Sequence, residues 1–131
     1  MNTTRDRQTP NNQTVFDQTD FFEADDFTRL LGLIATQVTL QVFLGNALQP
    51  WGLQDGYPVP DTQVVSGKVY WHEVPGAPGI YGVRWRPNAV GYWRLVFTLP
   101  AHQQIVGLGY DVVPLGRTVQ GIQTSFFKPS C

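Results

Sequence analysis

The fold class of this chain is decided by Gly79-Ile80-Tyr81-Gly82-Val83-Arg84-Trp85-Arg86-Pro87 and by Gly91-Tyr92-Trp93-Arg94-Leu95-Val96-Phe97. Successive side chains of a pleated strand point to opposite faces, so a period of two indicates two half-buried β-strands and fits no helix. One face carries the large apolar side chains of Tyr81, Val83, Trp85, Trp93, Leu95 and Phe97. The opposite face carries Arg84, Arg86, Tyr92 and Arg94.

The same alternation continues along the rest of the chain. Further strands are expected at 36–44, 47–51, 63–74 and 105–113, and a last strand or C-terminal arm at 117–127. The side chains expected to face a core are Val38, Leu40, Val42, Leu44, Val65, Val69 and Trp71. Glycine- and proline-rich turns separate these segments, and about seven short strands with such spacing are typical of an all-β sandwich.

The N-terminal part is expected to lie outside the sandwich. Residues 1–20 hold few large apolar side chains and cannot form a core of their own. We therefore expect an extended arm over 1–34, held by other chains, and a β-sandwich domain over 35–131. A chain that begins at Asp26 should then still fold.

A short helix within the arm is one of two interpretations of its second half. Asp20 and Glu23 have the spacing of a helix start. An apolar stripe at helical spacing follows, made by Phe27, Leu30, Leu31 and Ile34. Gly32 disfavours a helix, so an extended docking segment is the alternative. In either case Phe16, Phe21 and Phe22 are candidate anchors for a partner, because aromatic rings often dominate interfaces. The alternative is that these rings pack on the chain's own sandwich.

Composition argues against several classes of function. The 131 residues carry only 15% charged side chains, against an average of about 25%, and a net charge of −1. The single cysteine is the last residue, Cys131, so no intrachain disulfide forms. The contexts of His72 and His102 lack the spacing of zinc ligands, and no phosphate-binding loop is present. We expect no enzyme activity, no metal and no cofactor. No apolar run approaches the length of about 20 residues that spans a membrane. Residues 1–20 contain no apolar h-region, so we expect synthesis in the cytoplasm without secretion.

Three arginines and a tyrosine form the second set of candidate site residues. Arg84, Arg86 and Arg94 with Tyr92 are compatible with nucleic-acid binding, but the chain is slightly acidic. Arginine without lysine suits bidentate contacts with carboxylates, so an acidic protein partner is favoured. A direct hairpin would place Arg84 opposite Arg94, which is unfavourable. That conflict favours two strands in different sheets, or an acidic partner that bridges them.

Pro78 to Pro87 and Val90 to Leu95 resemble a pattern of immunoglobulin-like sandwiches of the filamin and macroglobulin type. In that pattern Gly-x-Tyr-x-Val-x-aromatic-x-Pro leads to a glycine that opens the next strand. The resemblance implies that the two strands lie in opposite sheets and that 87–90 crosses between them. The paired cysteines of antibody domains are absent.

The whole chain is similar in style to small virion proteins of tailed bacteriophages, which combine a polar N-terminal arm with a compact, weakly charged sandwich. This resemblance implies a structural protein of the virion, most naturally a capsid decoration or cement protein. Its expected partners are the major capsid protein, other virion proteins and neighbouring copies, and neither nucleic acid nor a membrane. A neck, tail or fibre-attachment protein is the alternative within that class.

A carbohydrate-binding or cell-surface module is the alternative from another class. Its stacking platforms would be Trp51, Tyr57, Trp71 and Tyr92.

Overall fold

The computed structural model describes residues 5–23 and 27–114, and these form two β-sheets without an α-helix. Three single 3-10 turns connect strands: Ala35–Gln37, Asp61–Gln63 and Pro100–His102. The strands in chain order are β1 (Arg5–Pro10), β2 (Val15–Asp20), β3 (Thr39–Leu44), β4 (Ala47–Gln49), β5 (Gly52–Asp55), β6 (Lys68–Glu73), β7 (Ile80–Trp85), β8 (Gly91–Leu99) and β9 (Gln104–Val113).

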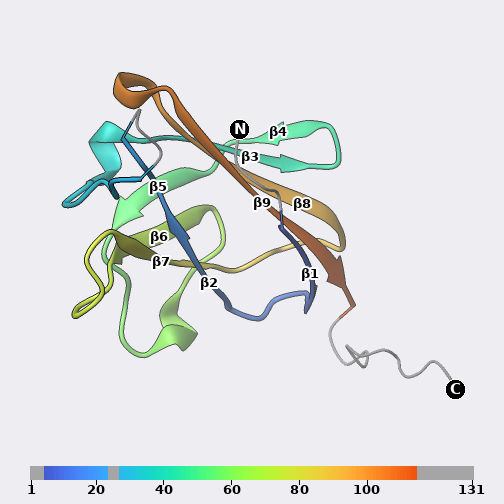
Figure 1. Cartoon of the computed structure of the whole chain (residues 1–131). Helices are drawn as coiled ribbons and strands as arrows, with labels where there is room; N and C mark the ends of the chain where they lie inside the picture. Colours follow the sequence, from blue (N-terminus) through green and yellow to red (C-terminus); the bar gives the residue numbers. More distant parts are fainter. Residues whose placement is uncertain (1–4, 24–26, 115–131) are drawn as a thin grey trace, which may run out of the picture.

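The two sheets are both of mixed type and enclose one core (Figure 1). One has the strand order β1-β9-β8-β3-β4 and the other the order β2-β7-β6-β5. Only β1 with β9 and β5 with β6 pair in parallel among these strands. The expected all-β sandwich is therefore confirmed, whereas its immunoglobulin-like character stays a prediction.

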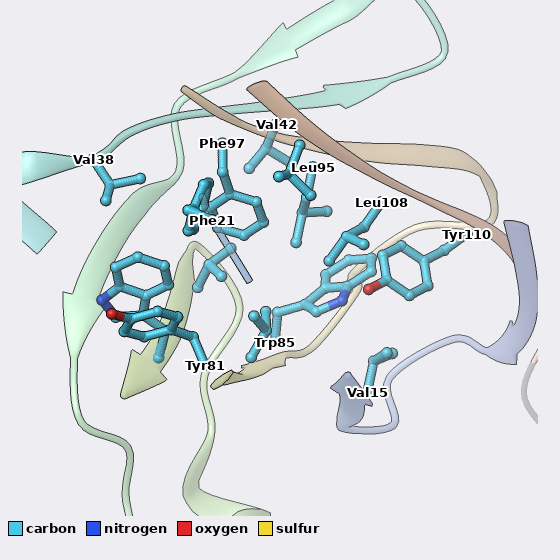
Figure 2. Close-up of a cluster of buried hydrophobic side chains, with 14 of the residues drawn as sticks. Val15, Phe21, Val38, Val42, Tyr81, Trp85, Leu95, Phe97, Leu108 and Tyr110 are labelled. Atoms are coloured by element: carbon cyan, nitrogen blue, oxygen red, sulfur yellow. The ribbon is translucent and has the colours of Figure 1, made fainter. Parts of the chain in front are cut away.

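The crossing between β7 and β8 is also confirmed, because these consecutive strands lie in opposite sheets. All six side chains expected to face inward from them are buried. The rings of Trp85 and Trp93 meet across the core with their centroids 5.4 Å apart, and neither is exposed. The crossing segment is tied to this core because the indole of Trp93 donates to the carbonyl of Ala89 at 2.9 Å. Figure 2 shows Trp85 and Tyr110 pointing toward each other between the sheets.

The expected arm is wrong for the residues that the structure describes. Each residue of β1 has a partner in β9, and each residue of β2 has one in β7. Figure 1 shows β1 beside β9, and β2 in the other sheet. The N-terminal segment thus supplies an edge strand to each sheet, and a division between 34 and 35 does not separate a domain. Among the described residues up to Phe21, the buried side chains are Thr9, Val15, Thr19 and Phe21.

The expected helix after Asp20 is absent from the described residues on either side of 24–26. Phe22 forms a β-bridge with Arg29, so the chain turns back on itself. The hydroxyl of Tyr81 then pins the return: it donates to the carbonyl of Leu30 at 2.7 Å and accepts from the amide of Leu33 at 3.1 Å. Of the expected apolar stripe only Leu30 is buried, and the other three members are exposed: Phe27, Leu31 and Ile34. Leu33, which is not part of the stripe, is buried as well.

One candidate for the core lies at the surface. Val65 was expected in the core but is 51% exposed, because β6 begins only at Lys68 and Val65 lies in the preceding loop. The other core candidates, from Val38 to Trp71, are buried or pack against the core. The segment 117–127, expected as a strand or arm, lies outside the described residues.

Candidate functional site

The seven expected site residues do not gather at one place. Tyr92 and Arg94 lie on the outer face of the five-stranded sheet, because their neighbours along β8 point inward. Arg84 and Phe16 are paired in register on the outer face of the four-stranded sheet. Phe21 belongs to neither face. It is fully buried and packs on Trp71 and Tyr81, so its expected role as a partner anchor is wrong.

Arg84 is engaged by its own chain. Its guanidinium lies 3.5 Å from the ring centroid of Tyr57 and 5.1 Å from that of Phe16, and it forms an ion pair with Asp61. Tyr57 and Asp61 belong to the loop between β5 and β6, which therefore packs against the outer face of the four-stranded sheet. The structure gives Arg84 an intrachain carboxylate where an acidic group of another protein was expected.

His72 continues the same cluster. Its ring stacks on Tyr57 at a centroid distance of 4.0 Å, and the Tyr57 hydroxyl is hydrogen-bonded to His72 Nε2 at 2.7 Å. Burial lowers the pKa of His72, and the positive charge of Arg84 lowers it further. The neutral imidazole is thus the form that fits this stack.

A surface cleft of about 450 Å³ adjoins the cluster. Gly82 is one of the residues that line it, and a Cβ at this position would lie 3.5 Å from the Tyr57 hydroxyl. Arg84 and Phe16 also line the cleft. Arg84 is ion-paired with Asp61, and the side chain of Phe16 is 45% exposed. Within the described residues, no three His, Cys, Asp or Glu side chains come close enough to hold a metal ion.

Arg86 and Phe22 belong neither to the cluster around Arg84 and Tyr57 nor to the outer face that carries Tyr92 and Arg94. Arg86 is half-buried, and its Nε has no hydrogen-bond partner among the described residues. Its carbonyl accepts from the hydroxyl of Ser66 at 2.9 Å. Phe22 is half-buried beneath the guanidinium of Arg29, which lies 6.0 Å from the ring centroid. Neither position presents a side chain that is mostly exposed.

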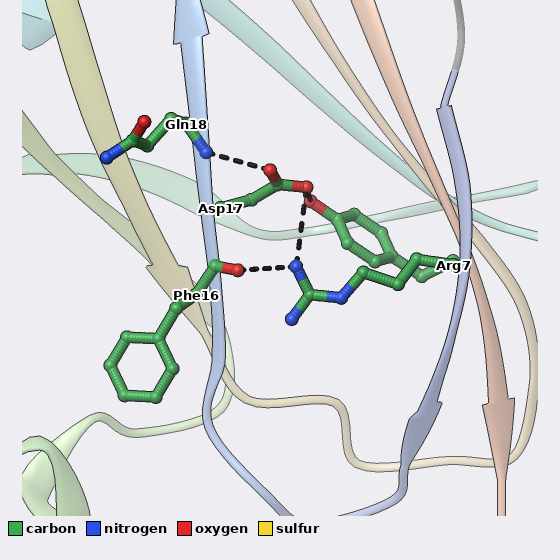
Figure 3. A network of polar contacts seen from close by, with 5 residues as sticks. Arg7, Phe16, Asp17 and Gln18 are labelled. Atoms are coloured by element: carbon green, nitrogen blue, oxygen red, sulfur yellow. Dashed lines mark hydrogen bonds and ion pairs between the residues drawn. The ribbon is translucent and has the colours of Figure 1, made fainter. Parts of the chain in front are cut away.

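The free edge of β2 is occupied by side chains (Figure 3). Arg7 reaches across from β1 and donates to the carbonyl of Phe16 at 2.6 Å. Asp17 accepts from the amide of Gln18 at 2.8 Å and from the hydroxyl of Tyr110 at 2.8 Å. Two main-chain groups of this edge, the carbonyl of Phe16 and the amide of Gln18, are therefore already bonded, which hinders pairing with another strand.

The outer face of the five-stranded sheet is the larger candidate surface. We call it the five-stranded face and define it by the outward positions of β3, β4, β8 and β9. Register places Leu48, Phe43, Arg94 and Gly109 in one row across these four strands. Leu48 is 59% exposed, and the Arg94 guanidinium lies over the Phe43 ring at 4.8 Å.

Apolar and uncharged residues dominate the remaining rows of this face. Tyr92 and Ile105 are 41% and 37% exposed. Arg94 and Asp111 are the two charged residues among the outward positions of the four strands. These positions are Thr39, Gln41, Phe43, Leu48, Tyr92, Arg94, Val96, Thr98, Ile105, Gly107, Gly109 and Asp111.

Three of the four aromatic residues expected as sugar-stacking platforms are used inside the fold. Trp71 is fully buried. Trp51 is half-buried against Trp85 and Trp93, with centroid distances of 5.8 and 5.3 Å. Tyr57 is covered by the guanidinium of Arg84. Tyr92 alone of the four keeps a large exposed surface.

Sequence reasoning missed part of each surface. The alternation at 36–44 and 105–113 already contained the outward phase that holds Phe43 and Asp111, but only its inward phase was assigned a role. Nothing in the sequence around Tyr57 and Asp61 indicated that this loop would fold over Arg84. Comparison with protein-family models and with curated proteins found no match. Within the described residues, no helix is long and apolar enough to cross a membrane.

Proposed function

We propose that this chain is a non-enzymatic structural protein of a bacteriophage virion, a capsid decoration or cement protein that binds through the faces of its sandwich. The observation that carries the proposal is the five-stranded face. It presents Leu48, Phe43 and Tyr92, and the outward positions of its four strands β3, β4, β8 and β9 carry one arginine and one aspartate. Exposed apolar surface bordered by polar groups marks protein-interaction sites.

The contact uses faces because three of the four sheet edges offer little to a partner. The free edge of β2 is bonded to Arg7 and Asp17. The outer strands at the opposite side, β4 and β5, have only three and four residues. Short and blocked edges disfavour strand addition. In this mechanism the N-terminal strands stabilise the sandwich. The sequence analysis instead expected an N-terminal arm that attaches the chain to its partners.

Composition supports the same assignment. Only 15% of the residues are charged, so the surface as a whole has little electrostatic protection against association. A protein whose surface is covered by other virion subunits does not need charges to prevent association in solution. The partners are then the major capsid protein or other virion proteins, with the sandwich lying across subunit boundaries of the shell.

The finer fold assignment is part of the proposal. With β2 and β3 labelled B and C and β6 to β9 labelled D to G, the two sheets contain the neighbours B-E-D and C-F-G. Immunoglobulin domains have these neighbours, which supports an immunoglobulin-like sandwich. That likeness concerns the fold and leaves the function to be argued from the surface.

The two alternatives differ in their support. A neck, tail or fibre-attachment protein uses the same kind of surface, and the number of copies per particle separates it from a decoration protein. A carbohydrate-binding module needs exposed aromatic platforms. It is less well supported because Trp51, Tyr57 and Trp71 are packed within the chain.

The test is a count of copies in virions of the phage that encodes the chain. Particles purified by density gradient are digested and the chain is quantified against the major capsid protein by mass spectrometry. A ratio near one copy per few capsid subunits supports a decoration protein. A dozen copies per particle or fewer supports a neck or tail position and rejects the decoration assignment. Absence from purified particles overturns the proposal.

A further inference from the structure

Four residues at one end of the five-stranded face form a patch with an unusual charge arrangement. Tyr92 is opposite Asp111 in the register of β8 and β9, and Arg94 is opposite Gly109. Arg94 and Asp111 therefore occupy diagonal corners, roughly 7–8 Å apart in an antiparallel pair. Within the described part of the chain, no ion pair joins either of them to another residue; Arg94 lies over Phe43 at 4.8 Å.

Within this patch, Arg94 and Asp111 supply one cation and one anion, so the patch is complementary to itself. In an isologous contact, residue i of one copy meets residue j of the other, and j meets i. A two-fold axis in the plane of the contact, running between Arg94 and Asp111, brings each arginine against the aspartate of the second copy. The same ion pair then forms twice.

The uncharged part of the patch fits the same arrangement. Tyr92 and Gly109 hold the other two corners, close to that axis. β9 places glycine at two outward positions, Gly107 and Gly109, and both are buried within the chain itself. Leu48 and Phe43 extend the row from Arg94 with apolar surface.

We propose that the five-stranded face pairs with the same face of a second copy of this chain, with Arg94 of each copy bonded to Asp111 of the other. This inference rests on the proposed function in taking this face as the contact surface, and it names the partner there. The patch and the adjoining row of Phe43 and Leu48 make a small interface, so a dissociation constant of roughly 1–100 μM is expected.

Mixing two variants tests the pairing directly. Sedimentation velocity of the full chain over roughly 1–500 μM, in reductant so that Cys131 cannot crosslink, should show a monomer–dimer equilibrium. Arg94→Asp and Asp111→Arg each place like charges at both contacts, so each alone should dimerise at least about tenfold more weakly. In an equimolar mixture, the introduced aspartate meets the introduced arginine at one contact, and the native Asp111 meets the native Arg94 at the other. The mixture should regain dimerisation to within a few-fold of the unmodified chain.

Several results would overturn the proposal. They are a full chain that is monomeric throughout the range, single variants that dimerise normally, and a mixture that stays monomeric. Near-ultraviolet circular dichroism of the buried tryptophans reports whether each variant is folded. Leu48→Glu lies on the same face but away from the charge pair, and it should also weaken the dimer. If this variant dimerises normally, the five-stranded face is not the contact surface.

The outcome is separable from that of the proposed function. A monomeric chain present in many copies per particle rejects this pairing and leaves the virion assignment intact. A dimer that is absent from particles rejects the virion assignment and leaves the pairing intact.

Discussion

The guanidinium of Arg84 lies 3.5 Å from the ring centroid of Tyr57, and the same tyrosine ring stacks on His72 at a centroid distance of 4.0 Å. A cation on the face of an aromatic ring is attracted by the ring quadrupole. A second cation at His72 would be repelled by the first. The stack therefore depends on a neutral imidazole.

This dependence predicts a loss of stability at mildly acidic pH. The pKa of His72 is lowered in the folded chain, so the unfolded chain binds the additional proton first. Stability is complete above the ordinary histidine value of about 6.5 and falls as the pH decreases through the lowered pKa. His72→Phe keeps a ring for stacking and removes the proton site. The drop in unfolding free energy between about pH 7 and pH 5 should be smaller in this variant than in the unmodified chain. Equal drops would show that His72 does not contribute.

The contact between Trp85 and Trp93 predicts the largest single loss of stability. Both rings are fully buried from opposite sheets, so Trp85→Ala leaves a cavity that the neighbours cannot fill. The expected cost is about 3–5 kcal/mol in denaturant unfolding. Val65→Ala is the control, because Val65 is 51% exposed, and it should change stability by less than about 0.5 kcal/mol. A cost below about 1 kcal/mol for Trp85→Ala is incompatible with the assigned core.

Gly79 and Gly76 form a matched pair in the turn before β7. Both have a positive φ, +84° and +80°. A Cβ added at Gly79 would lie 2.7 Å from the Cβ of Arg29, whereas at Gly76 nothing lies within 4 Å. Alanine at either position should cost backbone strain, but only Gly79→Ala adds a clash. We expect its unfolding free energy to fall by about 1–3 kcal/mol more than that of Gly76→Ala. Equal losses would place Arg29 elsewhere.

Removal of the N-terminal strands distinguishes the observed sandwich, in which they are edge strands, from the expected arm outside it. A chain beginning at Asp26 lacks β1, β2 and the buried ring of Phe21, so it exposes the pairing edges of β9 and β7. It should lose cooperative unfolding and aggregate. Near-ultraviolet circular dichroism and denaturant titration check this. A cooperative transition like that of the full chain would restore the arm interpretation.

The strands at 79–97 were predicted correctly from the sequence and the segment 1–34 was not, and both outcomes have the same physical origin. Around Trp85 and Trp93 each strand has a fully buried face, so the period of two is strong. β1 and β2 are edge strands, and β2 buries only Val15 and Thr19. Their place in the sheets comes from pairing with β9 and β7, which local sequence does not encode.

The same limit applies to the candidate site. The outward phase of Arg84 and Arg94 followed from alternation, and their separation onto two faces followed from the crossing between sheets. The ion pair with Asp61 spans 23 positions and rests on an irregular loop, so no periodicity could reveal it. Phe27, Leu31 and Ile34 had helical spacing, yet hydrogen bonds to Tyr81 hold the segment in another conformation.

The most direct test of the central claim is binding of the purified full chain to phage particles that lack it. Leu48→Glu places a charge on the five-stranded face, and Val65→Glu places the same charge on a similarly exposed aliphatic position outside that face. Co-sedimentation should show saturable binding of the unmodified chain and of Val65→Glu, with at least about tenfold weaker binding of Leu48→Glu. Equal binding of both variants, or no binding of the unmodified chain, would contradict the account.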